Sequence, residues 1–114
     1  MKLIGSNTER DFRKQLNESY ESLFNVKPSP LLALLQSKFP VMKTAYILNW
    51  IPEQGEDIYT IFIDREIIVI VELDRFNLEL EPLLETISMN DYVKGLSKIN
   101  QIKLAVAIDL ASKQ

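Results

Sequence analysis

The stretch IIVIVELDR, residues 67–75, is the best indicator of the fold class. A short apolar run rich in branched side chains is typical of a strand that lies in a core. Side chains two positions apart on a strand point to the same face, so Ile68 and Ile70 share a face with Glu72 and Asp74. One face of the predicted strand therefore changes from apolar to acidic along its length.

The neighbouring segments indicate further strands. Residues 58–63 (IYTIFI) and 41–51 (VMKTAYILNWI) are rich in branched and aromatic side chains. Short connections, PEQGED at 52–57 and Asp64-Arg65-Glu66, separate the three strands. Such connections imply an antiparallel meander. A weaker alternation at 76–81 predicts a fourth, edge strand that ends at Pro82.

Capping signatures mark the helices. Ser6 and Glu9 form an S-x-x-E capping box, and Ser29-Pro30 and Ser88-Met89-Asn90-Asp91 are further helix starts. The predicted helices span residues 8–24, 30–39 and 89–111. Gly95 is a weak point in the last one.

The order of these elements is α-α-β-β-β-(β)-α, which predicts a single α+β domain over residues 1–114. We expect a three- to four-stranded antiparallel meander with the helices packed on one face. A chain of 114 residues is long enough to bury a core without disulfides or a structural metal.

The composition argues against most enzyme chemistry. The chain has no cysteine and no histidine, which excludes thiolate nucleophiles, catalytic triads that use histidine, and imidazole or thiolate metal ligands. Its three glycines form no phosphate-binding motif. We therefore predict a protein that is not an enzyme and needs no cofactor or metal. No apolar run is long enough to cross a bilayer, so a cytoplasmic location is expected.

A metal-dependent enzyme that uses carboxylates of the meander is an alternative. Asp64, Glu72 and Asp74 resemble the acids of a magnesium site, but Asp74 stands where that layout needs a lysine. Asp64 and Glu72 are also separated by roughly 20 Å at the usual rise of a strand. These facts favour the interpretation that Glu72 and Asp74 mark the point where the strand leaves the core and becomes polar.

Charge is distributed unevenly along the chain. Residues 53–85 contain ten acids and two bases, a net charge of −8, whereas the rest of the chain carries +5. Such asymmetry can attract a basic partner, although exposed turns also collect charge for solubility. The basic residues Arg10, Arg13 and Lys14 alternate with acids, so no direct nucleic-acid binding is expected.

Two surfaces are therefore predicted. The first is an acidic partner-binding surface that comprises Trp50, Glu53, Glu56, Asp57, Glu72 and Asp74. Trp50 would be its aromatic anchor, or alternatively the last core residue of its strand. The second surface arises because residues 102–111 are apolar almost all round a helix, which requires either internal burial or a homodimer. Its interface residues would be Ile102, Val106 and Leu110.

The function predicted from these features is a non-catalytic protein-binding module. A small acidic inhibitor or antidote of a basic protein would have this profile. A structural subunit that assembles through the C-terminal helix is a further alternative.

Overall fold

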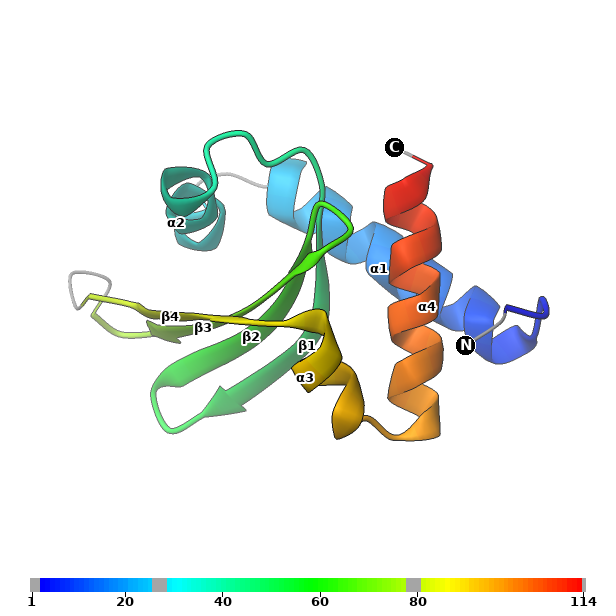
Figure 1. The fold of residues 1–114 in the computed structure, drawn as a ribbon. Helices are drawn as coiled ribbons and strands as arrows, with labels where there is room; N and C mark the ends of the chain where they lie inside the picture. Colours follow the sequence, from blue (N-terminus) through cyan, green and yellow to red (C-terminus); the bar gives the residue numbers. More distant parts are fainter. Residues whose placement is uncertain (1–2, 26–28, 78–80, 114) are drawn as a thin grey trace.

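The computed structural model describes residues 3–25, 29–77 and 81–113. Along these residues lie α1 (Asn7–Asn25), α2 (Pro30–Lys38), β1 (Ala45–Glu53), β2 (Glu56–Ile63), β3 (Ile67–Asp74), β4 (Leu83–Ile87), α3 (Met89–Lys94) and α4 (Lys98–Ser112). The strands form one antiparallel sheet in the order β1-β2-β3-β4 (Figure 1). The predicted α+β domain with an antiparallel meander is therefore confirmed.

The capping box at the start of α1 is present. Ser6 Oγ accepts the N–H of Glu9 at 3.2 Å. The Glu9 carboxylate in turn accepts the N–H of Ile4 at 3.0 Å and that of Gly5 at 2.9 Å. These bonds, first of all the one from Ile4, lower the pKa of Glu9 below its ordinary value of 4.5.

Replacing Glu9 with glutamine is expected to lower the melting temperature in a pH-dependent way. Because the pKa of Glu9 is lower in the folded state, its carboxylate contributes fully above pH 4.5 and loses that contribution as the pH falls through the folded-state pKa. The gap between Glu9→Gln and the parent protein should therefore be widest near neutral pH and close in acid. Thermal unfolding at several pH values measures it. Glu18→Gln removes a charge from an exposed position of α1 as a control, and equal behaviour of the two variants would contradict the capping role.

The predicted helix 89–111 is wrong in one respect, because it is broken into α3 and α4 at Gly95. Ser88 Oγ accepts the N–H of Asp91 at the start of α3, as its sequence signature predicts. A second serine, Ser97, accepts the N–H of Asn100 at 3.2 Å and starts α4. A cap of this kind competes with continuation of a helix, so the chain turns where Gly95 already weakens it.

The fourth strand lies later than predicted. Residues 78–80 of the predicted strand 76–81 are outside the described residues, and β4 follows Pro82 instead of ending there. The N–H groups of Phe76 and Asn77 donate to Asp74 Oδ1, at 2.9 and 2.8 Å, which forms a turn directly after β3. Proline is compatible with the beginning of an edge strand because it lacks an N–H to donate.

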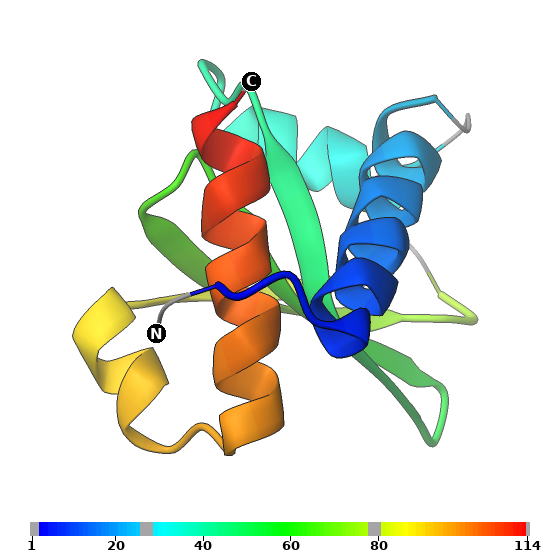
Figure 2. The same cartoon turned by 90° about the vertical axis from the view of Figure 1, so that its right-hand side faces the viewer.

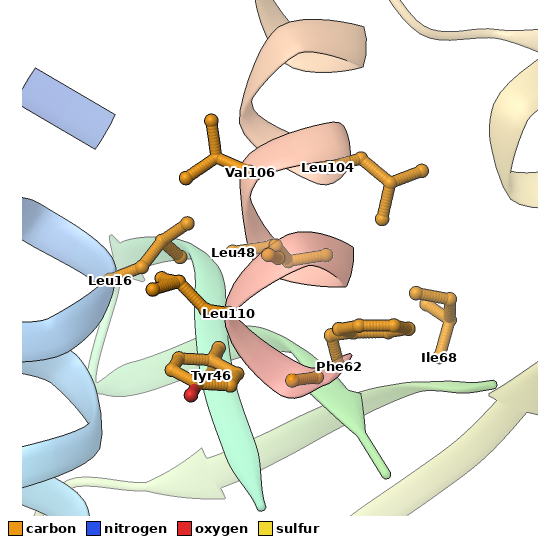
Figure 3. Packing of buried hydrophobic residues seen from close by; sticks show 10 residues of the cluster. Leu16, Tyr46, Leu48, Phe62, Ile68, Leu104, Val106 and Leu110 are labelled. Carbon is orange, nitrogen blue, oxygen red and sulfur yellow. The ribbon is translucent and has the colours of Figure 1, made fainter. Parts of the chain in front are cut away.

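Helices cover both faces of the sheet, not one. Ile61, Ile63, Val69 and Val71 pack with the leucines of α2, whereas Tyr46, Leu48, Phe62 and Ile68 pack with Leu16 of α1 and with Leu104, Val106 and Leu110 of α4 (Figures 1 and 3). The prediction of a single covered face fails because successive residues of β2 and β3 are apolar. A strand that is apolar on both sides needs cover on both sides.

α1 lies beside the β1 edge of the sheet, and Figure 2 shows β1 between α1 and α4. The N–H of Ile47 points to this edge and donates to Ser19 Oγ of α1 at 3.1 Å. A β-bulge at Leu48 shifts the pairing, so that Asn49 lies opposite Thr60. None of the helices in the described residues is long and apolar enough to span a bilayer.

Candidate functional site

The far half of the sheet extends beyond α3 and α4, at the left of Figure 1. Here three carboxylates lie side by side across three strands, because Glu53 pairs with Glu56 and Glu56 pairs with Asp74. Directly paired residues share a face, so all three side chains belong to the face that α3 and α4 cover further along. Glu72 shares this face, two residues before Asp74. The sheet therefore gathers four of the six predicted partner-binding residues.

Apolar side chains that sequence reasoning missed lie among these acids. In the neighbouring row of paired residues on this face, Ile51 pairs with Ile58, Ile58 pairs with Glu72, and Glu72 pairs with Leu83. Ile51 is 43% exposed and Leu83 is 65% exposed. That Ile51 and Leu83 lie beside the acids can be recognised only when the register of the strands is known. We call this surface the acidic face; it comprises Ile51, Glu53, Glu56, Ile58, Ile70, Glu72, Asp74, Leu83 and Glu85.

Asp57 and Trp50 do not belong to the acidic face, which corrects the prediction. Each is adjacent in its strand to a residue of the acidic face, so their side chains point to the opposite side of the sheet. Trp50 stacks on Tyr59 with 6.4 Å between ring centroids, and its Nε1–H donates to Asp57 Oδ1 at 3.0 Å. Trp50 is therefore neither buried in the core nor part of the acidic face, but remains 55% exposed on the opposite side of the sheet.

The charge of Asp57 is neutralised locally. Arg75 Nη2 lies 2.8 Å from Asp57 Oδ1, and Arg75 also donates to the main-chain oxygen of Glu56. The hydrogen bonds from Arg75, and to a smaller extent the one from Trp50, lower the pKa of Asp57. Burial, with a smaller effect from Asp57, raises the pKa of Tyr59. The carboxylate is charged, but the pair that it forms with Arg75 has no net charge with which to attract a basic partner.

Asp64 has a structural task that sequence reasoning did not identify. Its Oδ1 accepts the N–H of Lys43 at 2.9 Å and that of Thr44 at 2.8 Å. These bonds hold the chain before β1 and explain why that strand begins at Ala45 and not at residue 41. Glu72 pairs with Ile58, far along β2 from this turn. Within the described residues, no three acids come together in a way that could hold a metal ion. Asp64, Glu72 and Asp74, the acids of the alternative metal-dependent enzyme, therefore do not form a common site.

The predicted oligomer interface lies inside the molecule. Val106 is fully buried, Leu110 is 8% exposed, and Ile102 packs against the same core. The sheet and α1 together provide the cover that the apolar helix needs (Figure 3). A second copy of the chain cannot reach Val106 or Leu110 without opening the core. Of the two predicted alternatives for these residues, the structure therefore has internal burial and not a homodimer interface.

No family model, curated protein or solved structure matches this chain. The class defined by its fold and site is an α+β domain with a partly uncovered acidic sheet face.

Proposed function

We propose that the protein is a non-catalytic binding module whose acidic face receives a basic and partly apolar surface of another protein. The observation that carries this proposal is the row formed by Glu53, Glu56 and Asp74. An inhibitor or antidote that covers a basic surface of its target would work in this way. The exposed side chains of Ile51 and Leu83 would supply the apolar part of the contact.

The like charges of this row are unfavourable for folding. Carboxylates directly opposite each other on neighbouring strands repel, and the described residues of the acidic face include no base that would compensate them. Glu53 and Glu56 form no ion pair with any described residue. A basic partner would remove this repulsion on binding, which supports a role for the row in recognition.

The geometry favours docking on the face rather than addition of a strand at the β1 edge. Strand addition requires free N–H groups along an edge. At this edge Ile47 donates to Ser19, Trp50 donates to Asn49 Oδ1 at 3.0 Å, and Pro52 has no N–H. The edge thus offers few donors to an incoming strand, whereas the side chains of the acidic face are accessible.

Glu53→Gln combined with Glu56→Gln is expected to weaken the binding of a short peptide of alternating lysine and leucine. Loss of two exposed charge pairs costs about 1 kcal/mol in total, which is roughly a five-fold loss of affinity. Amide chemical shifts in an NMR titration measure the affinity and locate the contact. The shifts should centre on Ile51, Ile58 and Leu83, and high salt should weaken binding.

Matched controls separate recognition from general charge. Glu18→Gln with Glu66→Gln removes two exposed acids outside the face and should leave the affinity unchanged. A peptide of alternating glutamate and leucine should not bind. The proposal fails if the lysine peptide causes shifts elsewhere in the protein, or if both double variants weaken binding equally.

A further inference from the structure

Lys103 is a half-buried cation that forms no ion pair with any described carboxylate. It lies in α4, with its Nζ 5.6 Å from the centroid of the Phe12 ring. In the parts of the chain that the structure describes, no acid lies within 4.0 Å of this Nζ. Burial lowers the pKa of Lys103, as expected for a charge that is removed from water without a counter-ion.

A polar hollow opens beside Lys103 where the α3–α4 connection meets the sheet. Its volume is about 180 Å³, and it is lined by Asn49, Thr60, Tyr92, Asn100 and Lys103 together with two leucines. Each of these five side chains carries a hydrogen-bond donor. No described acid lines the hollow. Among the described residues that line it, the only charged side chain is therefore positive, although the whole chain carries −3.

Three of the five donors of this hollow are in positions that favour donation to a ligand. Asn49 Oδ1 already accepts the N–H of Trp50, which leaves the side-chain N–H groups of Asn49 for the hollow. Burial raises the pKa of Tyr92, so its hydroxyl stays protonated and can donate. Asn100 lies in the first turn of α4, where the helix dipole also favours negative charge.

We propose that this hollow binds a small anionic ligand through a carboxylate or phosphate group that pairs with Lys103. The volume equals that of about six water molecules, which is enough for such a group and a few further atoms. A larger hollow of about 600 Å³ shares Asn49 and Lys103 and reaches Trp50 and Tyr59, and its lining includes one acid, Glu18. The uncharged part of an organic anion would occupy this larger hollow. This site adjoins the acidic face, because Thr60 of the hollow pairs with Ile70 of that face, but it does not rest on the binding function proposed for the acidic face.

Titration with inorganic phosphate and with citrate, at constant ionic strength set by chloride, tests this site. Saturable shifts of the Asn49 and Asn100 side-chain amides are expected in NMR spectra with at least one of the two anions. Saturation by phosphate alone assigns a phosphate group, and saturation by citrate alone assigns a carboxylate. Shifts that chloride reproduces, or that do not saturate with either anion, overturn the proposal.

Lys103→Met keeps the apolar stem against Phe12 and removes the charge. It is expected to reduce the affinity for the bound anion at least about ten-fold, while the melting temperature stays equal or rises because an uncompensated charge leaves a half-buried site. Lys98→Met removes an exposed lysine from the same helix and should change the affinity less than about two-fold. Equal losses in both variants would indicate a diffuse charge effect and contradict the site.

A second variant keeps the test independent of Lys103. Asn100 is exposed and outside the core, so Asn100→Ala removes one donor without disturbing packing. It should weaken binding of the same anion several-fold, and full affinity in both Asn100→Ala and Lys103→Met would exclude this hollow.

Discussion

Replacing Phe62 with alanine is expected to lower the free energy of unfolding by about 3–5 kcal/mol. Phe62 is fully buried on the inner strand β2, where its ring packs with Tyr46, Ile68 and residues of α4 (Figure 3). Removing the ring loses its burial and leaves a cavity that rigid neighbours cannot close. Since single domains are stable by only about 5–15 kcal/mol, this one change removes a large part of the total.

Urea unfolding followed by circular dichroism measures this loss. Phe76→Ala deletes the same ring from a position that is 82% exposed and should cost less than about 1 kcal/mol. If Phe62→Ala were as mild as this control, the helix α4 would not be packed on the sheet as described.

Replacing Asp64 with alanine is expected to cost about 2–3 kcal/mol. The carboxylate accepts two N–H groups, and that of the buried Thr44 would lose its partner. Asp64 also has a positive φ of 48°, which aspartate and asparagine adopt more readily than alanine. Urea unfolding again gives the magnitude.

Asp64→Asn separates the two explanations for this acid. Asparagine keeps an acceptor oxygen and tolerates the same backbone conformation, so we expect it to retain most of the stability. Equal destabilisation by Asn and Ala would mean that the negative charge itself is needed. That result would favour a cation bound by Asp64 at this turn.

Local patterns were enough to predict most of the secondary structure. The capping residues Ser6, Ser29 and Ser88 all bond as their sequence signatures predict. The predicted strand 67–74 coincides with β3, since its apolar run has no competing helical period. Helix starts and short buried strands depend on residues close in sequence, which explains these successes.

The candidate site was predictable only in part. A concentration of acids in residues 53–85 is visible in the sequence, but their partners are not. Asp57 is neutralised by Arg75, which follows 18 residues later, and Asp64 holds residues 20 and 21 positions earlier. Glu53 and Glu56 pair with each other, and no described base offsets them. These four acids of similar appearance in the sequence thus have three different roles.

The sequence alone determined the order of the first five elements, the antiparallel meander and the acidic end of the strand IIVIVELDR. The tertiary structure decided that helices cover both faces, that Val106 and Leu110 are internal, and that Lys103 faces a polar hollow. The physical reason is the range of the interactions. Hydrogen bonds of caps and turns join near neighbours, whereas burial and charge compensation depend on residues that only strand register and helix packing bring together.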